Sequence, residues 1–164
     1  MNIGIIYYSK SGNTKQIAEQ IKKQAEEKDH TVDVVEVVPE KQPGFLKAGH
    51  SAIRQKDLPI ENDSLDASSW DVVFVGSPIW AGKPAPFIKT FLDKTSNLQG
   101  KKTSMFITCS GGSESKTINL LKSYLEEKQA KVHNDTLIVH MNRKGEIKKE
   151  MPSVEDFTSS VLNN

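Results

Sequence analysis

Short apolar runs that alternate with segments of helical periodicity constrain the fold of this chain more than any other feature. Residues 3–8 and 72–76 are almost continuously apolar, which is typical of strands that helices cover on both faces. Between them, residues 13–28 place apolar side chains every three or four positions, as an amphipathic helix does. Because parallel strands need a crossover that helices supply, the alternation predicts an α/β fold with a doubly wound, mostly parallel sheet.

The same patterns place the remaining elements along the chain. Residues 39–69 are less regular and suggest only a short helix near residues 45–53, while the charged residues 142–150 are expected to form a solvated loop. The expected strands are 3–8, 31–38, 70–76, 101–109 and 131–140, and the expected helices are 13–28, 84–94, 115–128 and 153–162. Five strands are therefore expected, in a single domain that spans residues 1–164.

Charge and cysteine content narrow the class of protein. The net charge of +1 offers no electrostatic footprint for nucleic acid or for a membrane surface. The single cysteine, Cys109, excludes an intrachain disulfide and fits a reducing compartment. No apolar stretch approaches the roughly 20 residues that a membrane-spanning helix needs. We therefore expect a cytoplasmic protein that binds neither nucleic acid nor membrane.

The loop after the first predicted strand has the composition of an anion site. It leads directly into the first helix, whose free N–H groups and positive dipole end favour a negative charge. Its three hydroxyls can donate to phosphate oxygens, and its glycine lets the backbone approach closely. An ordinary capped turn uses the same residue types, so both interpretations stay open at this point. The loop consists of Ser9, Lys10, Ser11, Gly12, Asn13 and Thr14.

The loops after the third and fourth predicted strands are the other candidates, because ligands of doubly wound sheets bind beyond the carboxyl ends of strands. Trp80 offers a flat surface on which a planar ring could stack, whereas Trp70 is expected to be structural. Cys109 is expected to be a small buried side chain rather than a redox group. The candidate residues are Pro78, Ile79, Trp80, Ala81 and Gly82 in one loop, and Cys109, Ser110, Gly111 and Gly112 in the other.

The order Ser-Lys-Ser-Gly-Asn-Thr at residues 9–14 resembles the phosphate loop of the flavodoxin family, and residues 76–86 look like that family in its flavodoxin and flavin-reductase branches. The resemblance spans nearly the whole chain. It implies a three-layer flavodoxin-like sandwich with strand order 2-1-3-4-5 and FMN as the cofactor. Residues 9–14 would then hold the flavin phosphate, and residues 78–82 and 109–112 would contact the ring.

Two departures from that family leave the type of electron transfer open. The loop at residues 108–113 brings no aromatic residue and has only Glu114 as an acidic neighbour, and the chain lacks the acidity that suits docking to basic partners. The leading interpretation is an electron carrier for a redox partner protein. The alternative is an NAD(P)H-dependent quinone or flavin reductase with a small-molecule acceptor, and a non-redox receiver-like domain is a third. Each of these three interpretations is compatible with a homodimer.

Other types of site find little support in the sequence. The histidines show no metal-ligand spacing, so no metal site is expected. Residues 76–83 imitate a nucleotide-binding glycine motif, but Pro84 replaces the Ser or Thr that this motif requires. A low-molecular-weight phosphatase would need an Arg where Ser115 stands, and a receiver would need acidic residues where Ser9 and Lys10 stand. No side chain is assigned a catalytic role.

Overall fold

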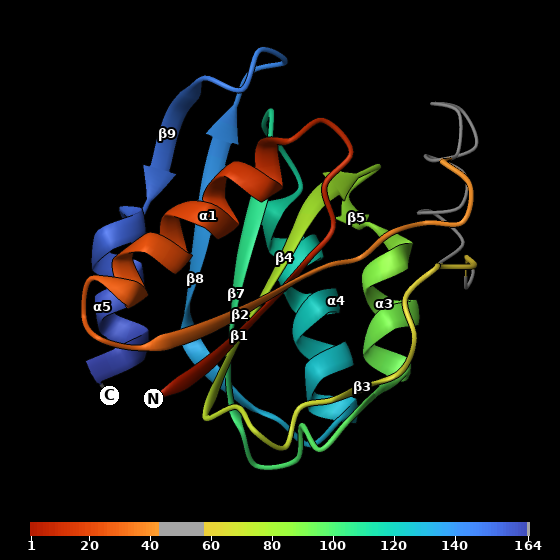
Figure 1. Cartoon of the computed structure of the whole chain (residues 1–164). Coiled ribbons are helices and arrows are strands. Elements are labelled where there is room, and N and C mark those ends of the chain that lie inside the picture. Colours follow the sequence, from red (N-terminus) through yellow and green to blue (C-terminus); the bar gives the residue numbers. More distant parts are fainter. Residues whose placement is uncertain (43–57, 164) are drawn as a thin grey trace.

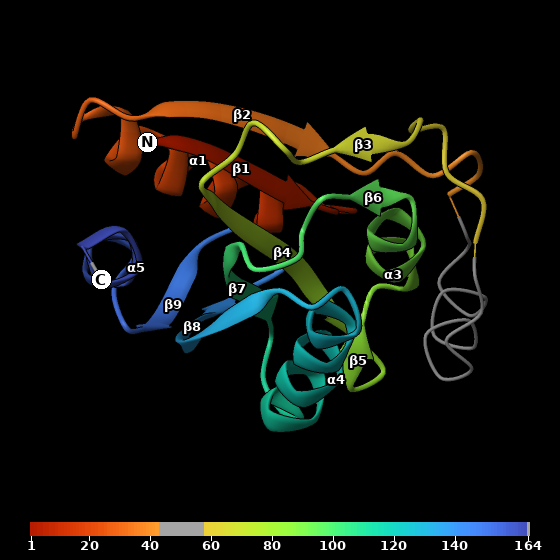
Figure 2. The same ribbon diagram turned by 90° about the horizontal axis from the view of Figure 1, so that it is seen from below.

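The computed structural model describes residues 1–42 and 58–163, which form a three-layer α/β sandwich. Figures 1 and 2 show α1 and α5 on one face of the central sheet and α3 and α4 on the other. The strands of this sheet are, in spatial order, β2 (Thr31–Glu36), β1 (Asn2–Tyr7), β4 (Val72–Trp80), β7 (Lys102–Cys109), β8 (Lys131–Met141) and β9 (Ile147–Met151). The helices are α1 (Asn13–Glu26), α3 (Pro86–Asp93), α4 (Glu114–Glu127) and α5 (Val154–Asn163).

The predicted strand order is confirmed for the parallel part of the sheet. In chain order, the predicted strands 2-1-3-4-5 are β2-β1-β4-β7-β8, and every neighbouring pair among them is parallel. Among the described residues between 39 and 71, β3 (Leu65–Asp66) pairs with β6 (Thr95–Ser96) in a separate small sheet, and Pro39 and Ile60 form an isolated antiparallel bridge. The short helix suggested near residues 45–53 lies outside the described residues.

Two predictions about loops were wrong. Residues 142–150 are not a solvated loop, because residues 147–151 form β9 and pair antiparallel with β8. Its charged side chains suit an exposed edge strand, where they discourage pairing with another chain. Residues 76–86 are not a simple loop either: β4 continues to Trp80 and turns back into the antiparallel β5 (Lys83–Pro84).

Alternation along β1 explains how one sheet supports two cores. Ile3, Ile5 and Tyr7 pack under α1 and α5, whereas Ile6 and Tyr8 point to the side of α3 and α4. Burial of each such side chain contributes about 1.5–3 kcal/mol relative to exposure.

Trp70 belongs to the core, as expected. It is buried, its ring packs directly over Gly4, and its indole Nε1 donates to Asp33 Oδ2 at 2.7 Å. A methyl group at Gly4 would lie only 2.1 Å from that ring, so β1 passes close beneath it. The structural role predicted for Trp70 is confirmed.

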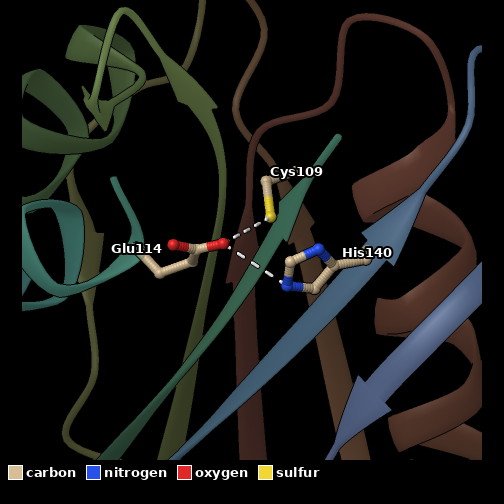
Figure 3. Close-up of side chains that lie close together, drawn as sticks. All are labelled: Cys109, Glu114 and His140. Atoms are coloured by element: carbon tan, nitrogen blue, oxygen red, sulfur yellow. Dashed lines mark hydrogen bonds and ion pairs between the residues drawn. The ribbon is translucent and has the colours of Figure 1, made fainter. Parts of the chain in front are cut away.

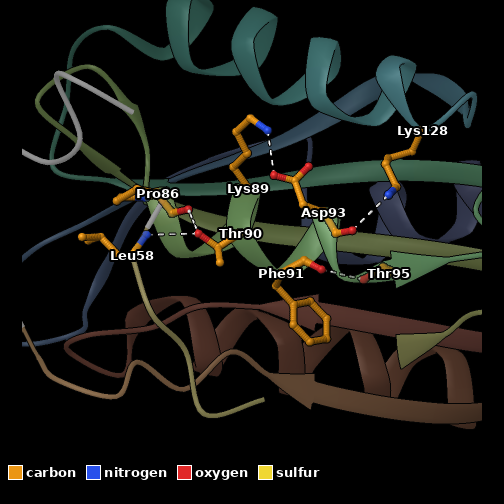
Figure 4. Close-up of polar contacts among 8 residues, drawn as sticks. All are labelled: Leu58, Pro86, Lys89, Thr90, Phe91, Asp93, Thr95 and Lys128. Atoms are coloured by element: carbon orange, nitrogen blue, oxygen red, sulfur yellow. Dashed lines mark hydrogen bonds and ion pairs between the residues drawn. The ribbon is translucent and has the colours of Figure 1, made fainter. Parts of the chain in front are cut away.

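The segment that follows the β4–β5 hairpin is tied down by side-chain bonds along α3 (Figure 4). Thr90 Oγ1 accepts the backbone N–H of Leu58 at 3.3 Å, and Thr95 Oγ1 donates to the Phe91 carbonyl at 2.9 Å. Lys128 Nζ, beyond the end of α4, donates to the Asp93 carbonyl at 3.4 Å. The last of these bonds joins the C-terminal end of α3 to the residue that follows α4. No helix in the described part of the chain is long and apolar enough to span a bilayer.

Candidate functional site

The three predicted loops converge at the carboxyl end of the parallel strands. A cavity of about 290 Å³ opens there, where doubly wound sheets bind their ligands. Seven of its lining residues were predicted site residues: Ser11, Asn13, Pro78, Ile79, Trp80, Cys109 and Ser110. The other predicted residues do not line this cavity but lie in the same three loops: Ser9, Lys10, Gly12, Thr14, Ala81, Gly82, Gly111 and Gly112.

The start of α1 lacks the side-chain cap that an ordinary turn would provide. Its N-cap residue is Gly12, with a φ of 89°, and no side chain bonds to the first turn. The hydroxyls of residues 9–14 are therefore not used to cap the helix. The Ser9 hydroxyl is buried and has no hydrogen-bond partner within the described part of the chain. A ligand with several acceptor oxygens would satisfy both this hydroxyl and the open helix end.

Thr14 occupies a different position from the other hydroxyls of this loop. It is buried, and its Oγ1 lies 2.8 Å from Thr108 Oγ1 at the end of β7, within hydrogen-bonding distance. This bond ties the first turn of α1 to the neighbouring strand. Thr14 thus already has a partner, and its role as a phosphate donor stays a prediction.

Trp80 sits at the tip of the β4–β5 hairpin and lines the cavity while its ring rests on the core. The ring meets Tyr8 edge-on at a centroid distance of 5.3 Å and Phe87 at 6.0 Å. The tight turn beyond it has positive φ at both Ala81 (47°) and Gly82 (75°), as two-residue hairpin turns often require. Trp80 is only partly buried, so it differs from the fully buried core residue that was the alternative interpretation.

The loop after β7 is shaped by three consecutive residues with positive φ, Gly111, Gly112 and Ser113. The Gly112 N–H donates to Glu114 Oε1 at 3.0 Å, which holds the loop against the start of α4. A methyl group at Gly82 would lie 3.2 Å from Ser113 Cβ, so the hairpin tip packs closely against this loop. The second and third loops therefore pack against each other at the hairpin tip.

Three further lining residues come from the end of β8 and the turn that follows it, which the sequence analysis did not include: Met141, Asn142 and Arg143. Asn142 Oδ1 accepts the backbone N–H groups of Lys144 and Glu146, and Asn13 Nδ2 donates to the Asn142 carbonyl at 3.3 Å. The turn thus closes against the start of α1. Its signal in the sequence is the Asn-Arg-Lys-Gly order directly after an apolar strand, which is typical of a tight turn.

Comparison with known protein families identifies the family of the chain. Residues 1–143 match the family described as NADPH-dependent FMN reductase. The chain belongs to this family. The match covers all three loops and the turn as far as Arg143, and it confirms the prediction of an FMN-binding flavoprotein with a flavodoxin-like fold.

Solved structures agree with the membership of the reductase family. A flavoprotein from Lactobacillus acidophilus, solved in complex with FMN, is 28% identical, with a TM-score of 0.68 over 84% of this chain and 91% of its own. A putative flavoprotein from Bacteroides eggerthii is 20% identical, with a TM-score of 0.72 over 98% of each chain. Flavodoxin 1 from Bacillus cereus is 20% identical, with a TM-score of 0.62 over 99% of this chain and 95% of its own. The last two likenesses establish the fold.

At the far side of the loop after β7, this reductase-family chain brings together Cys109, Glu114 and His140 (Figure 3). His140 Nε2 lies 3.4 Å from Glu114 Oε1, and Cys109 Sγ lies 3.9 Å from the same oxygen. The sequence analysis found no ligand spacing for His140, because the β7–β8 register, which sets Cys109 opposite His140, is a tertiary feature. Although these groups are chemically suited to a metal ion, the bonds of Glu114 to His140 and Gly112 explain the arrangement without one.

Protonation states in this cluster follow from its surroundings. Burial raises the pKa of the Cys109 thiol, and the neighbouring Glu114 carboxylate adds to the effect. A hydrogen bond from its own backbone N–H, at the start of α4, lowers the pKa of Glu114. At neutral pH the thiol is therefore protonated and a weak nucleophile, as expected for a packing residue.

Proposed function

We propose that this protein is an FMN-dependent oxidoreductase that oxidises NADPH or NADH and passes the electrons to a small acceptor such as a quinone or a free flavin. The observation that carries this proposal is the match of residues 1–143 to the NADPH-dependent FMN reductases. It favours the alternative of the sequence analysis over the electron carrier. In the overall reaction, the hydride of NADPH and one proton from solvent reduce a quinone to a quinol, and NADP⁺ is released.

The residues at the start of α1 fit the phosphate end of FMN. A phosphate monoester would accept from the buried Ser9 hydroxyl, from Ser11 and from the open N–H groups of the first helical turn. Gly12 presents no side chain, and a methyl group there would meet nothing within 4 Å, so the loop leaves room for the ligand. We therefore propose that residues 9–14 hold the phosphate.

The ring of FMN would lie between the hairpin tip and the loop after β7. Pro78, Ile79 and Trp80 line the cavity from the hairpin, and Cys109 and Ser110 line it from the loop after β7. When bound, FMN supplies the capacity to accept a hydride and to release electrons singly or in pairs. The protein supplies position and polarity, and in this proposal no side chain acts as acid or base.

The exposed loop after β7 leaves the cavity accessible to a small second substrate. Residues 110–113 are Ser, Gly, Gly and Ser, and all four are exposed. No aromatic residue of this loop covers the cavity opposite Trp80, so a planar molecule could approach a bound ring there. With 22 basic and 21 acidic residues, the chain also lacks the strong net charge that steers an electron carrier to a protein partner.

One experiment separates the reductase from the carrier. The purified protein is loaded with FMN, its visible spectrum is recorded, and it is mixed without oxygen with NADPH or NADH. We expect bleaching of the flavin absorbance within the time of a steady-state turnover, and continuous NADPH oxidation when a soluble quinone is added. Flavin that binds but is reduced by neither nucleotide would contradict the reductase proposal and restore the carrier. A protein that binds no FMN would overturn both.

A further inference from the structure

A second cavity of about 420 Å³ adjoins the flavin cavity along the β8–β9 hairpin. The two cavities share four lining residues, which are Ser110, Met141, Asn142 and Arg143. The second cavity adds His140, Lys148 and Lys149. We call it the hairpin pocket. A molecule bound there would lie beside whatever occupies the flavin cavity.

An irregularity in β9 explains how two consecutive lysines can line the same pocket. Lys149 pairs with His140 and Ile147 pairs with Met141, so Lys148 is an extra residue on the edge strand. In a regular strand, neighbouring side chains point to opposite faces, whereas a bulge re-aims one of them. The bulge thus lets Lys148 and Lys149 line one pocket together with Arg143.

The hairpin pocket is strongly cationic. Arg143, Lys148 and Lys149 contribute three positive charges, and no carboxylate is among the lining residues of the described chain. Two carboxylates outside the lining contact it: Glu146 pairs with Lys148 at 3.2 Å in a solvent-exposed ion pair and accepts from Asn142 Nδ2, and Glu114 contacts His140. Exposed pairs of this kind contribute little, so Lys148 can exchange Glu146 for a ligand at small cost. Such a pocket selects an anion with several oxygens, above all a phosphate.

We infer that the hairpin pocket binds phosphate groups of the nicotinamide dinucleotide that reduces the flavin. The identity of this ligand rests on the proposed function, which requires such a dinucleotide beside the flavin cavity. Lys148 and Lys149 lie beyond the segment that matches the family, residues 1–143, whereas the other lining residues lie within it. Arg143, which lines both cavities, bridges the two ligands.

Direct binding tests this inference without turnover. The FMN-loaded protein is titrated by calorimetry with adenosine 2′,5′-bisphosphate, which carries phosphates but no nicotinamide. We expect the double variant Lys148→Gln/Lys149→Gln to bind it at least about tenfold more weakly, because two charged hydrogen-bond donors are lost. Lys144→Gln is the matched control, since Lys144 is exposed on the same turn and does not line the pocket. Equal affinity in wild type and double variant would overturn the inference.

Kinetics of the same variants then identify the phosphate that is held. A rise in KM for NADPH alone, with kcat unchanged, assigns the pocket to the 2′-phosphate, and a rise for both NADPH and NADH assigns it to the pyrophosphate. A rise in KM only for an anionic quinone would overturn the inference and make this an acceptor site. Lysine-dependent binding of the bisphosphate by a protein that never oxidises NADPH would contradict the proposed function and leave the pocket standing.

Discussion

The start of α1 and the hairpin pocket are both suited to phosphate, but they are built from different chemistry. The first offers hydroxyls and backbone N–H groups at an uncapped helix end with one lysine, Lys10, in its loop, whereas the second offers three full charges on a turn and an edge strand. Fixed dipoles give geometric selectivity and depend weakly on salt. Exposed charges attract from a distance and are screened within about 10 Å at 0.1 M salt. The comparison suggests a permanent ligand at the first site and an exchanging one at the second.

Removing the unpartnered hydroxyl should produce the largest effect. Ser9→Ala is expected to weaken FMN by about 10–100-fold, because a hydrogen bond to a charged group contributes roughly 1.5–3 kcal/mol. Affinity for riboflavin, which lacks the phosphate, should be unchanged when measured by flavin fluorescence. The ligand-free protein should be as stable as wild type, since the hydroxyl has no partner within the described residues. Equal loss for FMN and riboflavin would contradict the phosphate role.

Variants of Thr14 test whether phosphate binding by residues 9–14 can be separated from the hydrogen bond that joins α1 to β7. Thr14→Val should weaken FMN about tenfold and also lower the free energy of unfolding by about 1–3 kcal/mol, because Thr108 Oγ1 loses its buried partner. Thr14→Ser keeps the hydroxyl and should restore most of both. Chemical denaturation and FMN titration measure the two effects. If FMN and riboflavin weaken equally, Thr14 belongs to the link between α1 and β7 rather than to the phosphate site.

Backbone conformation at the helix start provides a matched pair of variants. Gly12 and Gly100 both have positive φ, 89° and 72°, and a methyl group at either would meet nothing within 4 Å. Alanine at each position should therefore destabilise the fold by a similar amount, about 1 kcal/mol. Only Gly12→Ala should also weaken FMN, by several-fold, because only Gly12 shapes the phosphate loop. A similar loss of FMN affinity in Gly100→Ala would show that the effect is global.

The dependence of ligand binding on salt concentration should distinguish the start of α1 from the hairpin pocket. Raising NaCl from about 50 to about 500 mM is expected to increase KM for NADPH several-fold, because screening weakens the exposed charges of the hairpin pocket. The FMN dissociation constant should change by less than about twofold. Steady-state kinetics measures the KM for NADPH, and equilibrium dialysis measures the FMN dissociation constant. A stronger effect of salt on FMN than on NADPH would reverse the comparison.

The smallest effect concerns the carboxylate that holds the loop after β7. The pKa of Glu114 is lower in the folded protein than its ordinary value of 4.5, so its contribution to stability is present above that pH and is lost as pH falls through the folded pKa. Glu114→Gln should remove this dependence, and the unfolding midpoints of variant and wild type should converge as pH falls below the folded pKa. Thermal unfolding between about pH 3 and 7 measures it. Parallel pH profiles for the two proteins would contradict the assignment.

Much of the site was predictable because it depends on short-range patterns. Apolar runs define β1, β4 and β7, and the loops that follow them converge because parallel strands end at one edge of the sheet. The hairpin pocket was not predictable in this way. Residues 142–150 have the composition of a solvated loop, and only pairing with β8 makes part of them a strand. The hairpin at residues 76–86 was missed because its Pro and Gly residues mask the continuation of β4.

The sequence by itself determined the α/β alternation, the strand order through its family resemblance, and the loop of residues 9–14, because hydroxyls, glycine and helix start are neighbours along the chain. Tertiary structure alone decided that Cys109 faces His140, that Asn13 meets Asn142, and that a bulge brings Lys148 and Lys149 to Arg143. These contacts depend on the register between strands. Register is set by packing and pairing across the whole sheet, and it leaves no local signal in the residues that it brings together.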